Sequence, residues 1–320
     1  MRKIFLTKLK NNKKNHIKMN IKKVVKTLMF IIISLLLFTL GKAITKDIIV
    51  NVEINRFKER AIFEYEENFE YYPGEMQHRK YYKVPRETSY EKNDKRNVFY
   101  DENKKYLGQT GDVFLSQESP FPNVFGIHQF ISYYFGGHAA IKTNYNTFVE
   151  AVGFPSSDES LLDIITHPGD QPHDYSVTIN ETSSNYWLNP KYRSKESEDY
   201  PYYGSYYRSK FIGVRVKNID EESIDKALDY ALDKVDKNLY NFLFFLDMKY
   251  KFYCTDLISR AYQDVMVEKD KQSVYARSLN DDGFITSVND IIISKDTYIA
   301  FYVEIINDIV HIYYLEDVEE

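Results

Sequence analysis

The chain has 320 residues, which is enough for one large domain or two small ones. Hydrophobic residues make up 43% of it and charged residues 28%, so a buried core is possible and a wholly disordered chain is excluded. With only 12 glycines and 9 prolines, collagen-like, low-complexity and most repeat architectures are excluded as well.

The net charge of −5 hides an asymmetry between the N-terminus and the rest of the chain. Residues 1–43 carry 11 lysines and arginines and no acid, which leaves 31 basic against 47 acidic residues in the remainder. Nucleic-acid binding depends on a basic surface that displaces counterions. The acidic balance therefore argues against a nucleic-acid partner.

The basic N-terminus precedes an apolar run over residues 27–40. Fourteen helical residues span about 21 Å, less than the ~30 Å hydrocarbon core of a bilayer. Small residues follow at Gly41 and Ala43, so the pattern fits a secretion signal cleaved after Ala43. The alternative is an uncleaved anchor through residues 24–41, with the body again outside the cytoplasm. Met19 offers an internal start with a shorter basic region.

The segment 44–107 is an N-terminal extension of uncertain structure. Residues 47–72 alternate in hydropathy and predict one or two strands or a short strand–helix unit, whereas residues 73–107 are polar and indicate a connecting region. The pattern becomes denser from Gly111. It predicts a strand over 112–115, a helix over 128–135, and a hairpin of strands over 138–142 and 147–152.

Residues 154–209 form a long stretch rich in Tyr, Ser, Asn, Asp and Pro. Insertions of this length inside a domain are uncommon and often cover a site. Its aromatic side chains are consistent with a groove for sugars or peptides. A self-packed surface insertion explains the same composition equally well.

The C-terminal part predicts further strands over 211–216, 291–293, 298–306 and 310–315. One helix begins after Asp220, which is a good N-cap with an acidic first turn behind it, and another begins at Cys254. Because helices and strands are segregated along the chain, we expect an α+β fold with an antiparallel sheet packed against helices.

Cys254 is the only cysteine, so an intramolecular disulfide is excluded, as is a lipid-modified cysteine after the signal. It lies where the predicted second helix begins, and backbone N–H groups with the positive end of the helix dipole favour a thiolate there. A buried, inert cysteine is the alternative interpretation of the same position.

His138 and Glu150 lie on the two strands of the predicted hairpin. A hairpin centred on Asn144 places them directly opposite each other, with both side chains on one face. A two-residue turn at Asn144 and Tyr145 would instead place Glu150 on the other face. With the odd-length loop, the carboxylate orients the imidazole toward a thiol, as in base–acid–nucleophile sites.

Several short blocks together resemble the permuted NlpC-type papain-like cysteine hydrolases, specifically the YiiX-like branch, over residues 108–293. The blocks are Gly111-Asp-Val113, Gly137-His-Ala-Ala-Ile141, Val149-Glu-Ala151, Asn238-Leu-Tyr-Asn-Phe242 and Tyr253-Cys-Thr-Asp-Leu257. Asp256 stands where that family usually has glutamate, and Leu239 where proline is common.

The resemblance implies a papain-like α+β domain over residues 108–320, interrupted by the 154–209 insertion. It implies Cys254 as nucleophile, His138 as base and Glu150 as orienting residue. It also implies Tyr240 near the oxyanion and Tyr253 as a residue lining the site.

Other chemistries have weaker support. A metal could use the same three residues, but the paired-cysteine spacing of a four-ligand site is absent. His167 and His173 lie in a turn-rich segment that is better explained as a solvated loop. No P-loop or dinucleotide-binding glycine pattern occurs, so we expect neither a cofactor nor a metal.

The expected function is that of an exported cysteine hydrolase that cleaves amide bonds, with cell-wall peptides (peptidoglycan) as substrate. A lipid esterase or acyltransferase on the same residues is one alternative. A non-catalytic extracytoplasmic binding protein that uses the aromatic insertion is the other. The expected location is periplasmic, cell-surface or secreted, or membrane-anchored with the body outside the cytoplasm.

Overall fold

The computed structural model describes residues 2–119, 124–134, 137–182, 184–244, 246–267, 278–280 and 285–318. The chain divides into two compact units, Met1–Thr45 and Lys46–Glu320.

Residues 2–45 of the first unit are helical and belong to α1 (Arg2–Glu59), which continues into the second unit. Among the described residues, Lys22–Glu59 is the one helical segment whose length and hydropathy would allow it to cross a membrane. Its large apolar side chains between Val24 and Phe38 are exposed. One long apolar helix near the N-terminus is compatible with a membrane span and with a signal sequence.

The second unit is a mixed α+β fold built on a large sheet. Within the described residues the sheet has nine strands in the order β1-β2-β11-β10-β7-β3-β4-β5-β6, and all neighbours are antiparallel except β2 and β11. The strands are β1 (Ile62–Tyr72), β2 (Glu75–Val84), β3 (Val113–Ser116), β4 (His138–Lys142), β5 (Phe148–Ala151), β6 (Ile179–Thr182), β7 (Lys210–Val216), β10 (Thr297–Ile306) and β11 (Ile309–Leu315). A parallel pair, β8 (Leu239–Tyr240) and β9 (Lys251–Phe252), lies outside the sheet.

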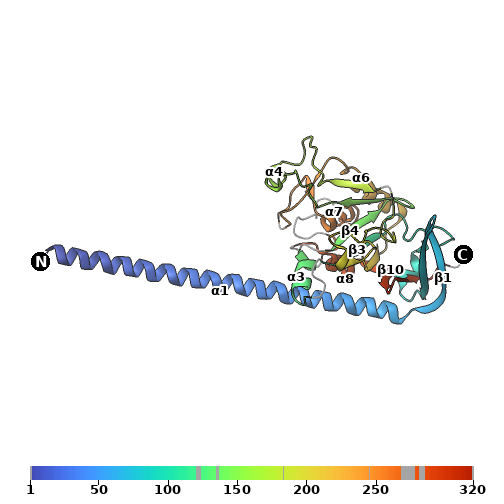
Figure 1. Cartoon of the computed structure of the whole chain (residues 1–320), viewed down its shortest axis with the longest axis horizontal. Helices are drawn as coiled ribbons and strands as arrows, with labels where there is room; N and C mark the ends of the chain where they lie inside the picture. The colour runs from blue at the N-terminus through green and yellow to red at the C-terminus, as the bar shows by residue number, and fades with distance from the viewer. Residues whose placement is uncertain are drawn as a thin grey trace. The chain divides into compact units, whose positions relative to one another are not determined.

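Helices pack on the strands that carry His138 and Glu150. The helix α7 (Cys254–Met266) contacts β4, β5 and α6 (Glu221–Leu232), whereas α8 (Val288–Ile293) contacts β3 and β10 (Figure 1). The remaining helices are α2 (Ser89–Asn93), α3 (Ile127–Tyr134), α4 (Leu161–Thr166) and α5 (Tyr200–Tyr203). The predicted α+β class with a mostly antiparallel sheet is therefore confirmed.

The prediction that residues 73–107 only connect is wrong, because β2 and α2 lie within them. The segment 44–107 thus contributes the β1–β2 hairpin to the main sheet through the parallel pairing of β2 with β11. The charged residues that suggested a connector form cross-strand pairs, for example Lys80 with Glu66 at 3.0 Å. Such pairs stabilise strands that lack an alternating apolar face.

The predicted strand over residues 291–293 is also wrong, because these residues end the helix α8. A capping box starts that helix: the Asp290 backbone N–H donates to the Ser287 hydroxyl, and the Ser287 N–H donates to the Asp290 carboxylate. The cap offsets the weak helix propensity of three successive isoleucines.

A buried ion pair joins β7 to the start of β3. Arg215 donates to both carboxylate oxygens of Asp112, at 2.8 and 3.1 Å, and neither side chain is exposed. The same guanidinium donates to the carbonyls of Arg96 and Asn97, each at 2.8 Å. Burial alone would lower the pKa of Arg215, but Asp112 and Asp94 outweigh it and raise that pKa. The guanidinium therefore stays charged and fixes the 94–97 segment on the sheet.

We predict that Arg215→Met lowers the free energy of unfolding by about 3–5 kcal/mol, since the buried Asp112 carboxylate then lacks its closest cation and keeps only the weaker contact with the Arg96 guanidinium at 3.7 Å and the Gln109 N–H. Urea denaturation of the detergent-solubilised chain measures the loss. Lys226→Ala, which breaks an exposed pair with Glu222, is the matched control and should change nothing measurable. An equal free energy of unfolding for the two variants would contradict a stabilising role for the Arg215–Asp112 ion pair.

Candidate functional site

Two strands of the sheet position the imidazole and the acid. His138 opens β4 directly after Gly137, whose φ of +78° is a left-handed conformation that favours glycine. A Cβ at Gly137 would lie 2.3 Å from the carbonyl oxygen of Ser116, so only glycine lets the strand enter the sheet here. Glu150 lies in β5, which pairs with β4.

The register of this hairpin differs from the predicted one. Glu150 pairs with Ala140, and the connecting loop is closed by the Thr143 N–H, which donates to the Thr147 carbonyl at 2.9 Å. The prediction of a loop centred on Asn144 is wrong, because the loop is centred on Tyr145. The loop keeps an odd length, however, so His138 and Glu150 still share a face as diagonal neighbours within reach of each other.

The imidazole and the carboxylate are in contact. His138 Nε2 donates to Glu150 Oε2 in a short hydrogen bond. Glu150 is only 5% exposed, whereas the His138 side chain keeps 16% of its surface accessible. The acid is therefore sealed, and the imidazole next to it reaches solvent.

Cys254 completes the cluster from the first position of α7. The residue before it, Tyr253, has an extended backbone at the N-cap, so the helix begins at Cys254. The Cys254 side chain is partly buried and is hydrogen-bonded to the His138 imidazole. The structure thus brings Cys254, His138 and Glu150 together although the cysteine lies more than one hundred residues downstream.

The cluster changes the proton affinity of the imidazole. Burial alone would lower the pKa of His138, but the hydrogen bonds to Cys254 and Glu150 and the carboxylate charge outweigh it and raise the pKa to about 9. The imidazolium is therefore the stable form at neutral pH. Because this value lies above 6.5, the stabilisation is complete below about pH 6.5 and is lost as the pH rises through about 9.

Tyr240 lies close enough to interact with the sulfur. It ends β8, and its ring packs on the backbone of Gly153, where an added Cβ would come within 2.6 Å of the ring. Burial, then the charge of Cys254, raises the pKa of Tyr240 well above its usual value. The hydroxyl therefore stays protonated and remains a hydrogen-bond donor beside the thiol.

Tyr253 has a different environment. Its hydroxyl accepts the backbone N–H of Thr286 at 3.0 Å, and its ring lies 5.4 Å from that of Phe244. The side chain is 6% exposed. These contacts tie the N-terminal end of α7 to the segment that leads into α8, so they fix the position of the cysteine backbone.

Sequence reasoning missed three aromatic residues beside His138. The Trp187 ring stacks on the His138 imidazole, with the ring centroids 6.0 Å apart. The Tyr207 ring meets the same imidazole edge-on, at a centroid distance of 6.1 Å. Tyr186 donates from its hydroxyl to Glu150 Oε2 at 2.5 Å. All three come from the 154–209 insertion, whose two aromatic runs, 185–190 and 200–207, were the available signal. Part of the insertion therefore packs behind the cluster, where Trp187 is fully buried.

Among the described residues, no group of three or more His, Cys, Asp or Glu side chains is arranged to hold a metal ion. The predicted solvated loop at His167 and His173 forms an aromatic cluster, in which the two imidazoles lie 5.7 Å apart and Tyr175 stacks on His173. The Gly169 N–H donates to His167 Nδ1 at 3.0 Å. These contacts are those of side chains that pack against one another within the loop.

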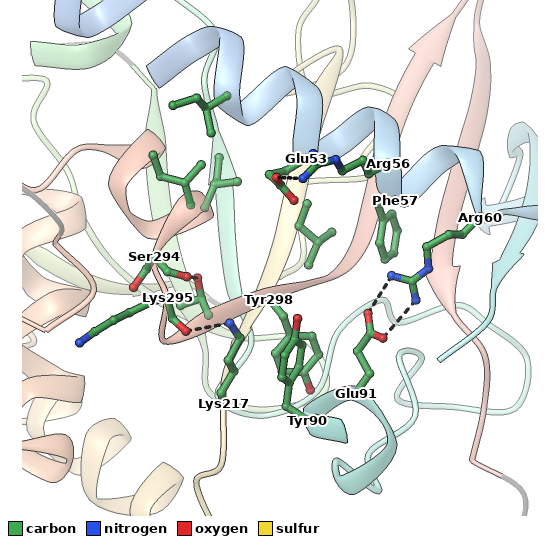
Figure 2. A pocket seen from close by; sticks show the side chains of 15 residues that line it. Glu53, Arg56, Phe57, Arg60, Tyr90, Glu91, Lys217, Ser294, Lys295 and Tyr298 are labelled. Carbon is green, nitrogen blue, oxygen red and sulfur yellow. Dashed lines mark hydrogen bonds and ion pairs between the residues drawn. The ribbon is translucent and has the colours of Figure 1, made fainter. Parts of the chain in front are cut away.

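A cavity of about 320 Å³ lies elsewhere, between the last turns of α1 and the α8–β10 connection (Figure 2). Several charged groups on its wall engage one another or the backbone. Arg60 binds Glu91, and the Lys217 ammonium donates to the Lys295 carbonyl at 2.7 Å while lying over the ring of Tyr90 (Figure 2). The fifteen residues that line the cavity include neither cysteine nor histidine, so it lacks the chemistry of the Cys254 cluster.

Comparisons of the chain with protein-family models, with curated proteins and with solved structures find no match. The geometry of the cluster is therefore the basis on which its chemistry is argued below.

We predict that Glu150→Gln lowers the pKa of His138 by about one unit or more, because the neutral amide no longer stabilises the imidazolium. Titration of the His138 ring signals by NMR measures the change. The wild-type value should lie near 9. Glu181→Gln, on the neighbouring strand β6, should leave the titration unchanged. A His138 value near 6.5 in the wild type would contradict the described geometry.

Proposed function

We propose that the second unit is a cysteine hydrolase in which Cys254 is the nucleophile, His138 the general base and Glu150 the orienting acid. The observation that carries this proposal is the imidazole of His138, which hydrogen-bonds both the thiol and a sealed carboxylate. That arrangement is the one required to activate a weak nucleophile and to hold the base in one orientation.

The reaction follows from these contacts. Since His138 already carries the proton at neutral pH, Cys254 attacks the carbonyl carbon of an amide as the thiolate, and a C–S bond forms as the carbonyl π bond opens. Tyr240 donates to the oxyanion as negative charge develops there. The tetrahedral intermediate collapses as His138 protonates the leaving amine, which breaks the C–N bond and leaves a thioester.

Water then completes the cycle. His138, neutral after giving its proton to the amine, removes a proton from a water molecule that attacks the thioester. The C–S bond breaks and the carboxylic acid leaves, while the proton taken from water stays on His138 and restores the thiolate–imidazolium pair. Glu150 keeps the imidazole oriented in both halves and stabilises the imidazolium present in each.

The proposal includes membership of the permuted NlpC-type papain-like hydrolases, in the YiiX-like branch. Its support is the order of the motif blocks together with a helix that starts at the cysteine and packs against the strands bearing the base and the acid. The substrate proposed is a peptide amide of the cell wall. An acyl ester of a lipid uses the same chemistry with an alcohol as leaving group.

We further propose that the hydrolase unit acts outside the cytoplasm, exported or held at the membrane. The support is the apolar part of α1 within Lys22–Glu59, which is long enough for a span and follows a strongly basic segment.

We predict that Cys254 reacts with iodoacetamide below about pH 8 and that His138→Ala moves this reactivity to alkaline pH, because the thiolate loses the imidazolium that stabilises it. Mass spectrometry of the carboxamidomethylated protein across pH measures the rate. Cys254→Ala should abolish labelling and turnover together, on peptidoglycan stem peptides or, as the second arm, on short-chain lipid esters.

His311→Ala is the matched control, since His311 lies on β11, four strands away from β4. Its labelling profile should equal that of the wild type. A thiol that reacts only at alkaline pH, with the same profile in the wild type and in His138→Ala, would refute the catalytic assignment and favour a non-catalytic binding protein.

We predict that the full-length protein stays in the membrane pellet after alkaline carbonate extraction, because α1 continues without interruption through Ala43. Immunoblotting of pellet and supernatant measures the distribution. Introducing Lys at Ile32 and Leu36 should release the protein into the supernatant. Release of the wild type as a shorter chain would instead show cleavage of a signal sequence.

A further inference from the structure

The acid of the cluster has a second hydrogen-bond donor. Glu150 Oε2, the oxygen that accepts from His138 Nε2, also accepts from the Tyr186 hydroxyl at 2.5 Å. With Glu150 only 5% exposed, water has little access to this carboxylate. The two donors therefore determine the direction in which the carboxylate points, and with it the orientation of the imidazole.

Contacts on both sides of Tyr186 fix its backbone. The Tyr71 hydroxyl of β1 donates to the Asn185 carbonyl at 2.6 Å, and the Asn185 N–H donates to Asn146 Oδ1 in the β4–β5 loop at 2.9 Å. Gln77 of β2 donates to the Leu188 carbonyl. The β1–β2 hairpin and the β4–β5 loop thus hold the 185–188 segment against the strand that carries Glu150.

The ring of Tyr186 is also enclosed by other aromatic rings. It stacks on Trp187 at 5.6 Å with an interplanar angle of 23° and meets Tyr207 edge-on at 4.7 Å. Burial, then the neighbouring Tyr207 and Glu150, raises the pKa of Tyr186 well above its usual value. The phenol therefore keeps its proton and can only donate to the carboxylate, since a phenolate would repel it.

We propose that Tyr186 is a positioning residue, whose hydroxyl holds the Glu150 carboxylate so that the His138 imidazole stays directed at Cys254. This inference rests on the proposed hydrolase function. It assigns a task to the 154–209 insertion and to the β1–β2 hairpin, because the hairpin supports the insertion and the insertion orients the acid. Neither segment then needs to contact substrate to affect the rate.

The test is Tyr186→Phe in the full-length protein, which removes one oxygen and keeps the ring packing. Turnover should fall about 10-fold in kcat with KM unchanged, because a loosely held acid misaligns the base in the transition state. The pKa of His138, measured by NMR, should fall in the same direction as in Glu150→Gln but by less. A role confined to packing would leave that pKa unchanged.

Tyr192→Phe is the matched control. Tyr192 belongs to the same aromatic group, with its ring 5.7 Å from that of Tyr186, and it is 42% exposed. Its variant should keep the kcat and the His138 titration of the wild type. Tyr71→Phe removes the hydrogen bond that holds the Asn185 carbonyl, so it should lower the kcat and the His138 pKa as Tyr186→Phe does, but by less. It is the second test variant if Tyr186→Phe melts at a lower temperature than the wild type.

The outcomes separate the two proposals. Wild-type turnover and His138 titration in both Tyr186→Phe and Tyr71→Phe would overturn the positioning role and leave the hydrolase proposal intact. Absence of His138-dependent thiol reactivity in the wild type would remove the hydrolase proposal. In that case, the His138 titration of Tyr186→Phe would still report whether this hydroxyl holds the carboxylate.

Discussion

The antiparallel register of β4 and β5 is the constraint on which the Cys254 cluster depends. Because side chains alternate between the faces of a strand, only an odd-length loop keeps His138 and Glu150 on the same face. The 143–147 loop meets that condition and places the two residues diagonally. A slip by one residue would turn the carboxylate to the opposite face, and no side-chain rotation would restore the contact.

The sequence allowed the two strands of this hairpin to be predicted, but it left open whether the loop is odd or even in length, and it did not give the register. The strand bounds 138–142 were exact, and the helices that begin near Asp220 and at Cys254 followed from an N-cap and from apolar spacing. The loop, Asn144-Tyr145-Asn146, contains no glycine or proline to mark its centre. Without that signal, two odd loops differing by one position in their centre are equally compatible with the pattern.

Other features were not predictable because they depend on distant partners. The β1–β2 hairpin has charges where a half-buried strand would have apolar residues, and its place in the sheet comes from pairing with β11, more than 220 residues away. Tyr186 is similar: a tyrosine in a polar segment gives no sign that its hydroxyl will reach Glu150. The hydropathy pattern of a segment shows whether it repeats like a helix or a strand. The contacts of the hairpin and of Tyr186 depend instead on tertiary packing with distant residues.

The two sides of the imidazole have opposite access to water, and this difference suits the proposed chemistry. On the acid side, Trp187 and Glu150 are closed off, so the carboxylate charge acts on His138 through a poorly screening environment. On the other side, Cys254 is partly exposed, as a nucleophile must be for substrate to approach. If water reached Glu150 as freely, water molecules would compete with the carboxylate for the His138 and Tyr186 donors. The hydrogen bond that orients the imidazole would then be weaker. The insertion that encloses the acid therefore maintains the difference in access to water between the two sides of His138.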